Sequence, residues 1–163
     1  MAESWKTRLH RWGFNWFPAY RATGGRIEYI AHDWMEVRIR LPLSLRTRNY
    51  VGTIFGGSMY AAVDPVYMLM LIKTLGPDYE VWDKAAAIRF RRPGRSTLHA
   101  AFRLDAPELE TIRAEVAASG RSERRYVVDL VDGANEVCAS CEKVLSIRVR
   151  RGRQPDDRGG ATA

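Results

Sequence analysis

The chain has 163 residues, the size of one ordinary domain, and its apolar content of 46% is enough for a packed core, which excludes a disordered protein. Its uncharged runs are too short to cross a bilayer, and charged residues interrupt the N-terminal aromatics where a signal peptide would be apolar, so we expect a cytoplasmic protein with no membrane span. Part of the net charge of +7 lies in residues 150–163, which we expect to form a disordered basic tail behind a single domain over residues 1–149.

The N-terminal segment is rich in aromatic side chains. Trp5, Leu9 and Trp12 recur at helical spacing and Pro18 follows them, so we expect one or two short helices over residues 1–22. Such a basic, aromatic stretch could lie on a membrane surface. We prefer the interpretation that it packs over the domain's own core or its ligand cleft.

Two strands and a uniformly apolar helix come next. Residues 27–32 and 35–41 have the composition of strands, and the second shows a clean alternation of apolar and polar residues. Gly56 then opens a helix that runs to about Leu75. Because this helix is apolar on nearly every face, it must be surrounded by protein.

The second half of the chain predicts four more strands and one shorter helix. The strands are expected over residues 86–91, 97–104, 125–131 and 137–149. A helix that begins at Pro107 turns its apolar residues inward: Leu109, Ile112 and Val116. A curled antiparallel sheet of about six strands, wrapped around the long central helix, satisfies this order with least strain. We therefore predict an α+β domain in the hotdog arrangement, with short N-terminal helices.

One segment carries a motif with chemical meaning. It contains Asn49, a GT pair, an FGG turn and Asp64. This spacing resembles the signature of hotdog acyl-CoA thioesterases of the phenylacetic-acid-degradation type. The whole chain is still more similar to the thioesterase-like group named domain of unknown function 4442, in which GTxFGG, DP and RPG recur. The resemblance implies hydrolysis of a thioester at sites shared between subunits.

The residue types in the motif fit that chemistry. Gly56 and Gly57 at a helix start expose backbone N–H groups, which would stabilise the oxyanion formed from a thioester carbonyl. Asp64, in an otherwise apolar helix, is a carboxylate whose burial would make it a stronger base or nucleophile. Asn49 would orient the water or the carbonyl.

The spacing of these residues also predicts the assembly. Gly56 and Asp64 are eight residues apart, which is about 12 Å along one helix. They can act on the same carbonyl only if they belong to different chains, so we expect a homodimer and possibly a dimer of dimers.

Structural roles for the same residues stay open. The two glycines would also suit a tight turn and close packing between helix and sheet. Asp64 precedes Pro65, which removes one helical hydrogen bond, so the carboxylate would then satisfy freed backbone groups. Lys84 would alternatively form a buried ion pair with Asp64.

The chain departs from the thioesterase pattern at two positions. Phe55 stands where the resembled enzymes have the histidine of an HGG turn, and Asp83, beside Lys84, stands near their water-positioning serine. We place these three residues, together with Tyr60, in the substrate-binding part of the site.

A basic rim and a cysteine pair complete the candidates. Four arginines surround an RPG turn: Arg89, Arg91, Arg92 and Arg95. Guanidinium groups suit the phosphates of coenzyme A, although a solvated sheet face has the same composition. Cys138 and Cys141 lack the further ligands of a zinc site, so we expect buried bystander thiols and no metal. Coenzyme A would enter as part of the substrate, with no separate cofactor.

These observations rank three functions. The first is an acyl-CoA thioesterase that yields a free acid and CoA. The second is a non-catalytic acyl-CoA or lipid-binding hotdog protein with the same cleft and arginines. A nucleic-acid binder is third, and we expect no nucleic-acid partner, because the aromatics are not interleaved with the basic stripe as stacking on bases requires.

Overall fold

In the computed structural model, which describes residues 3–150, the chain begins with the helices α1 (Trp5–Trp16) and α2 (Pro18–Thr23). The next elements are β1 (Arg26–Ile30), β2 (Glu36–Leu41) and the consecutive helices α3 (Gly56–Val63) and α4 (Val66–Leu75). The second half contains β3 (Tyr79–Phe90), β4 (Leu98–Arg103), α5 (Ala106–Ser119), β5 (Arg121–Val131) and β6 (Val137–Val149). Within the described residues, no helix is long and apolar enough to span a membrane.

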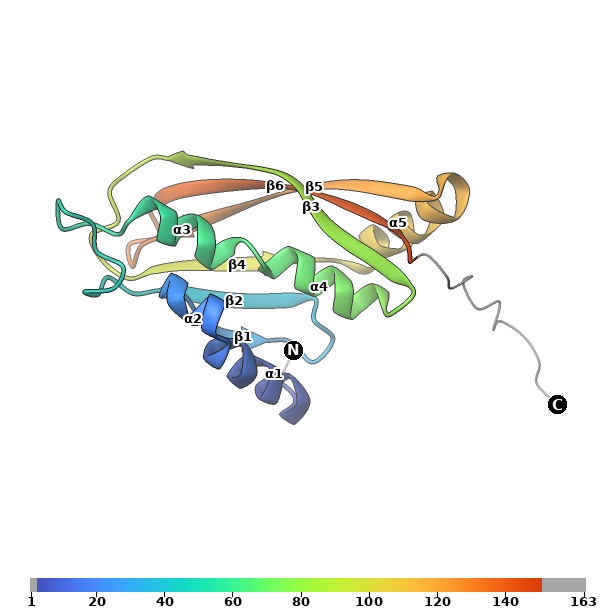
Figure 1. Cartoon of the computed structure of the whole chain (residues 1–163), viewed down its shortest axis with the longest axis horizontal. Coiled ribbons are helices and arrows are strands. Elements are labelled where there is room, and N and C mark those ends of the chain that lie inside the picture. Colours follow the sequence, from blue (N-terminus) through green and yellow to red (C-terminus); the bar gives the residue numbers. More distant parts are fainter. Residues whose placement is uncertain (1–2, 151–163) are drawn as a thin grey trace.

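The six strands form one antiparallel sheet in the order β1-β2-β4-β5-β6-β3. The sheet curls around α3 and α4, which run along its inner face, while α1 and α2 lie beside β1 (Figure 1). The predicted α+β fold, with six strands around a long central helix and short N-terminal helices, is confirmed. The order leaves β3 at one edge of the sheet, where one side of its backbone has no neighbouring strand among the described residues.

The core lies between the inner face of the sheet and the central helices. Met70 and Leu71 of α4 are fully buried, and Tyr67 stacks on Tyr126 of β5 with 4.3 Å between ring centres. The central helix is therefore surrounded by protein, as its composition predicts. The inward side of α5 is also as expected, because its buried residues are Leu109, Ile112 and Val116.

The central helix is broken in the middle. Pro65 has no N–H to donate, so the helical ladder is interrupted there and α3 and α4 are separate helices. The Tyr20 hydroxyl donates to the Ala62 carbonyl at 3.2 Å and satisfies a backbone acceptor beside the break. Asp64 lies at this interruption.

Four sequence-based boundaries or placements need correction. β3 begins at Tyr79 and β5 at Arg121, both earlier than expected: β3 is exposed over most of its length, and the residues that open β5, from Arg121 to Arg124, are all polar. The N-terminal segment packs over the core through Phe14 and Tyr20, as expected, but its tryptophan stripe does not, since Trp5 and Trp12 are 72% and 62% exposed. Of the expected tail, Arg150 is placed and donates its backbone N–H to the Asp78 carbonyl at 2.8 Å, and residues 151–163 lie outside the described residues.

Candidate active site

A buried lysine lies between two carboxylates at the break in the central helix. The side chain of Lys143, from β6, is 1% exposed, and its ammonium donates to Oδ1 of Asp64. The same nitrogen lies 3.0 Å from Oδ1 of Asp83 on β3. The Tyr60 hydroxyl donates to Oδ1 of Asp64 at 2.7 Å. Four side chains from three elements therefore form one polar cluster inside an otherwise apolar layer.

The register of the sheet explains how the cluster forms. Lys143 is paired with Ala86 of β3 and Tyr126 of β5, and directly opposed residues share one face of a sheet. A bulge between Asp83 and Ala85 shifts the alternation of β3 by one residue. The bulge keeps Asp83 on the same inner face as Ala86, so its carboxylate reaches Lys143.

The charges in the cluster stabilise one another. Burial alone would lower the pKa of Lys143, but its hydrogen bonds to Asp64 and Asp83 outweigh burial and raise that pKa. Burial raises the pKa of the Asp83 carboxyl, and Lys143 offsets only part of this effect. Burial, followed by the hydrogen bond to Asp64, raises the pKa of Tyr60, which stays a donor at neutral pH.

Asp64 keeps one oxygen available. Both of its hydrogen-bond donors, Lys143 and Tyr60, bind Oδ1, and no other described residue donates to Oδ2. The side chain is 41% exposed. A water molecule or a substrate carbon can therefore approach Oδ2 while Oδ1 is held in place.

Three expectations about this aspartate are wrong. It is not buried in the single chain, because the inner face of β3 is open beside it. Its side chain does not satisfy the backbone freed by Pro65, since its partners are side chains and Tyr20 binds a neighbouring carbonyl instead. Lys84 is not its ion-pair partner, because Lys84 follows Asp83 at the bulge, points to the other side and binds Glu123 at 2.5 Å.

A second group of predicted residues meets at the start of α3. Asn49, Gly56, Arg91 and Arg92 line a pocket of about 390 Å³ together with Phe90. No side chain caps the first N–H groups of α3, so these donors remain open for a ligand. The pocket thus joins the predicted oxyanion donor to part of the predicted phosphate rim.

The Asn49 amide shapes this pocket from a loop. Its nitrogen donates to the Thr53 hydroxyl at 2.9 Å, and its oxygen accepts the Thr53 backbone N–H at 3.0 Å. These bonds close the loop before α3, so a structural role for Asn49 is evident. A role toward a water or a carbonyl stays a prediction.

Two phenylalanine rings lie against the glycines of α3. A Cβ atom at Gly56 would come within 2.7 Å of the Phe90 ring, and one at Gly57 within 2.3 Å of the Phe55 ring. The glycines therefore allow close packing, as the structural alternative holds. Phe55 and Phe90 are both more than half exposed, so these rings form an open apolar wall beside the N–H groups.

The arginine rim is only partly assembled at the pocket. β3 ends at Phe90, so Arg91 lies beyond the strand and shares the pocket with Arg92, which pairs with Glu136 at 2.5 Å. Arg89 and Arg95 are exposed and do not line this pocket.

Lys143 is the site residue that the sequence interpretation missed. Its signal is visible in the strand, because alternate residues from Ala139 to Ile147 are apolar except Lys143. A lone lysine on the buried face of a strand requires a carboxylate partner.

Neither cysteine belongs to the cluster. Cys138 and Cys141 are free and buried, and burial raises the pKa of the Cys141 thiol to about 11. Within the described residues, no three side chains of His, Cys, Asp or Glu are grouped so as to hold a metal ion.

Comparisons with known proteins agree with this architecture. A family model described as "Domain of unknown function (DUF4442)" matches residues 7–147. The structure is similar to PA5026 from Pseudomonas aeruginosa, a protein of unknown function described as a probable thioesterase, with a TM-score of 0.79, 24% identity and coverage of 88% of this chain and 96% of that one. No curated protein matches the chain.

Two other solved structures have the same fold at lower identity. Thioesterase HI1161 from Haemophilus influenzae matches with a TM-score of 0.64 and 17% identity, over 86% of this chain and 91% of that one. The PaaI protein from the phenylacetic acid degradation operon of E. coli matches with a TM-score of 0.61 and 16% identity, over 90% of this chain and 93% of that one. These similarities establish the hotdog fold of thioesterase-like proteins.

Proposed function

The chain belongs to the DUF4442 family and has a thioesterase-like hotdog fold, and we propose that it hydrolyses an acyl-CoA to a free acid and CoA. The observation that carries this proposal is the half-exposed Asp64 carboxylate, held by the buried Lys143 with one oxygen left open. A fixed carboxylate with an accessible oxygen is what activation of water, or direct attack on a thioester, requires. The names of PA5026 and HI1161 refer to the same class of activity.

Asp64 acts as general base in the proposed reaction. Its Oδ2 takes a proton from water while the water oxygen attacks the thioester carbonyl carbon, and the carbonyl oxygen becomes an oxyanion. The tetrahedral intermediate then breaks its C–S bond, and the CoA thiolate receives the proton from Asp64. In the nucleophilic variant, Oδ2 attacks the carbonyl carbon and the C–S bond breaks, which releases the CoA thiolate and leaves a mixed anhydride on Asp64. Water then hydrolyses the anhydride to the free acid and the Asp64 carboxylate, and the thiolate takes up the proton that is released.

Lys143 and Tyr60 are positioning residues in this proposal. They bind Oδ1 of Asp64 and so orient Oδ2. The positive charge of Lys143 also serves as the counter-ion of the carboxylate. Asp83 is a second counter-ion of the Lys143 ammonium.

The oxyanion donor is proposed to come from a second chain. Gly56 and Asp64 are eight residues apart, about 12 Å along helical structure, and the sites would therefore be completed in a homodimer. Two features support an interface at β3. This edge strand is exposed over most of its length, and apolar side chains near it are more than half exposed: Tyr50, Val51, Phe55 and Phe90.

The geometry of an edge-to-edge dimer favours the shared site. If β3 paired antiparallel with its copy about a two-fold axis at Ala87, Ala86 would lie opposite Ile88 of the partner subunit, and the bulge after Asp83 would bring that carboxylate near Phe90 of the partner subunit. Within one chain, Phe90 packs beside Gly56, and Asp83 shares Lys143 with Asp64. Such pairing would bring the start of one α3 toward the Asp64 cluster of the other chain. A dimer of dimers stays a further prediction.

The coenzyme end is proposed to lie at the arginine rim. Arg91 and Arg92 line the pocket that contains Gly56, so phosphates bound there would direct the thioester toward the start of α3. The exposed rings of Phe55 and Phe90 offer apolar surface for the acyl part. Lys84 faces Glu123 on the other side, so we do not place it at the thioester.

A non-catalytic acyl-CoA-binding protein is the second candidate. The observation that favours it is the pairing of Asp64 with Lys143, because the same contact would also serve as a purely structural ion pair. Binding with no turnover would then be the outcome.

The test is a thiol-release assay across a panel of acyl-CoAs that varies chain length and aromatic character. We expect hydrolysis of at least one member by the wild-type chain, and a loss of about a hundredfold or more in Asp64→Asn, which keeps the size of the side chain but removes the base. Asp129→Asn, an exposed carboxylate on the outer face of β5, is the matched control and should keep full activity. Tight binding of an acyl-CoA without turnover would favour the second candidate.

A further inference from the structure

Helix α1 contacts the domain through Phe14 and polar side chains, and its solvent side carries a stripe of large apolar residues. Its large apolar residues recur at intervals of four, three and four, which places them on one face of a helix: Trp5, Leu9, Trp12 and Trp16. Their exposed fractions range from 56% to 72%. Thr7, by contrast, is the buried residue of this fully described helix.

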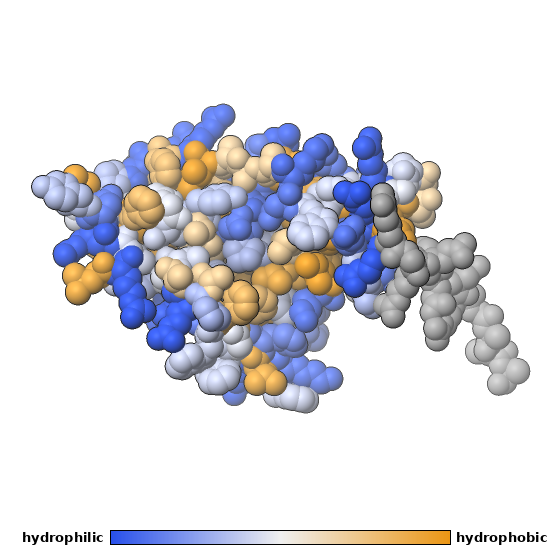
Figure 2. Space-filling view, viewed as in Figure 1, coloured by the Kyte–Doolittle hydropathy of each residue, from blue (hydrophilic) through white to orange (hydrophobic). Residues whose placement is uncertain are grey.

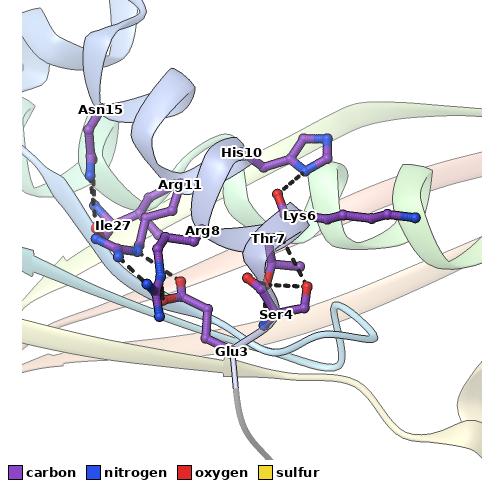
Figure 3. A network of polar contacts seen from close by, with 9 residues as sticks. All are labelled: Glu3, Ser4, Lys6, Thr7, Arg8, His10, Arg11, Asn15 and Ile27. Carbon is purple, nitrogen blue, oxygen red and sulfur yellow. Dashed lines mark hydrogen bonds and ion pairs between the residues drawn. The ribbon is translucent and has the colours of Figure 1, made fainter.

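Polar contacts fix α1 in this orientation (Figure 3). The Asn15 amide donates to the Ile27 carbonyl of β1 at 2.9 Å and accepts the Ile27 N–H at 2.8 Å. Ser4 and Thr7 form a capping box at the helix start, and Glu3 binds Arg11 at 2.8 Å. These hydrogen bonds hold the helix against the domain in an orientation that exposes the tryptophan stripe to solvent.

The charges around the aromatic face have one sign. No acidic residue occurs from Trp5 to Gly25, and Glu3 is neutralised by Arg11. Arg8 is 70% exposed, and the Arg21 guanidinium lies 4.9 Å from the ring centre of Trp16. Lys6 lies 5.7 Å from the ring centre of Trp5. Cations thus stand at the border of the apolar stripe.

We propose that α1 is a membrane-binding helix, which lies in the interface of a bilayer that contains anionic phospholipid. Tryptophan prefers the headgroup layer, because its ring is apolar and its N–H is polar, and flanking Lys and Arg side chains bind lipid phosphates. Figure 2 shows pale and orange side chains protruding at the lower edge of the molecule, where α1 lies in Figure 1.

Two further observations favour a lipid surface over a second copy of this chain. Two copies of the stripe would bring Lys6 and Arg8 of both chains together beside Glu3, which is already bound to Arg11, whereas an anionic surface attracts these cations. A groove of about 400 Å³ also runs beside the stripe, lined by Leu9, His10, Gly13, Phe14 and Phe17, and offers room for part of a lipid chain. Because α1 is already folded and capped, binding requires little further ordering.

Sedimentation of the full chain with lipid vesicles tests this inference. The vesicles are phosphatidylcholine alone, or phosphatidylcholine with phosphatidylglycerol. We expect binding to the mixed vesicles that weakens with salt and is much weaker on the neutral ones. The double substitution Trp12→Ser and Trp16→Ser should reduce binding by roughly tenfold or more, because it removes apolar surface while serine and tryptophan have similar helix propensities.

The charge contribution is tested by a matched pair of variants. Arg8 and Arg103 are comparably exposed, and each forms one long ion pair. The N···O distance is 3.8 Å for Arg8 and 3.7 Å for Arg103. Arg8→Gln should weaken binding to mixed vesicles by about fivefold, and Arg103→Gln should leave it unchanged. Val127→Ser removes an exposed apolar side chain from the outer face of β5. It is the control for the tryptophan variant.

Three results would overturn the proposal. The first is a folded wild-type chain that does not sediment with the mixed vesicles. The second is equal loss of binding in Arg8→Gln and Arg103→Gln, which would mean unspecific attraction by net charge. The third is a smaller sedimenting mass of the tryptophan variant without lipid, which would identify the stripe as a contact between chains. The test does not depend on thioesterase activity.

Discussion

Replacing Lys143 with methionine would remove the charge from the centre of the polar cluster while keeping the length of the side chain. Loss of one partner from a fully buried ion pair costs about 3–5 kcal/mol. Here the ammonium is 1% exposed, but the Asp64 and Asp83 side chains remain 41% and 28% exposed and keep part of their water. We therefore expect a loss of about 1–3 kcal/mol, or a fall in Tm of about 3–10 °C for a domain of this size.

The pH dependence of this loss follows from the pKa of Asp83. Burial already raises that pKa, and the substitution removes the contact that lowers it. A raised pKa means that the folded state binds the proton more tightly, so stability is gained as the pH falls through the folded-state pKa and lost as the pH rises through it. The deficit of the variant at neutral pH should therefore shrink on acidification.

The alkaline side gives an independent check. Because Lys143 has a raised pKa, its contribution is fully present below the ordinary lysine pKa of about 10.5 and is lost as the pH rises through the folded-state value. The wild-type chain should lose this stability at high pH, and the variant has none of it to lose.

Thermal unfolding followed by circular dichroism at several pH values measures these effects. Lys84→Met is the matched control, because Lys84 is 60% exposed and its solvated ion pair with Glu123 should contribute little to stability. A Lys143→Met variant that melts with the wild type at neutral pH, or whose deficit grows on acidification, would refute the reasoning.

Three further predictions concern the coenzyme rim, the thiols and one turn. Arg91→Gln combined with Arg92→Gln should raise KM for acyl-CoA by about tenfold with kcat little changed, and Arg103→Gln should alter neither; equal KM values would exclude the rim as a phosphate site. Cys138 and Cys141 should not react with a chromogenic disulfide reagent at pH 8 until the chain is unfolded, since burial raises the pKa of Cys141 to about 11; rapid labelling of the native chain would contradict this. Gly120→Ala should lower Tm by about 2–4 °C because Gly120 ends α5 with φ +77°, whereas Gly133→Ala, at an open position without positive φ, should not; equal melting would argue against backbone strain.

Much of the fold could be predicted from the sequence because local pattern and burial coincide in it. The apolar run from Gly56 to Leu75 specifies a surrounded helix, and α5 turns inward the residues that its spacing predicts. The starts of β3 and β5 could not be predicted in this way. β3 is mostly exposed and β5 opens with four polar residues, so apolar alternation does not mark these starts and pairing with β6 fixes them.

The sequence predicts which residues form part of the site better than it predicts which side chains contact one another. The motif identifies Asp64 and Gly56, but the partner of Asp64 depends on long-range register: Lys143 is brought to it by a strand 79 residues further along the chain. Lys84 was the wrong partner for Asp64 because the bulge places Asp83, rather than Lys84, on the inner face, and a bulge leaves little trace in sequence. The orientation of α1 was missed for a related reason, since its polar side, with Asn15 bound to Ile27, faces the domain.

The most direct test of the shared thioesterase site is a subunit-exchange experiment with two inactive variants. Asp64→Asn removes the base, and Gly56→Pro removes the oxyanion donor at the first position of α3, where proline is compatible with a helix although the neighbouring Phe90 ring must shift. Both variants are first shown to be folded and inactive. Each heterodimer then contains one site with an intact Gly56 and an intact Asp64, so equal mixing at random should recover about a quarter of the wild-type activity. No recovery, with heterodimers shown to form, would mean that the two residues do not act together across the interface.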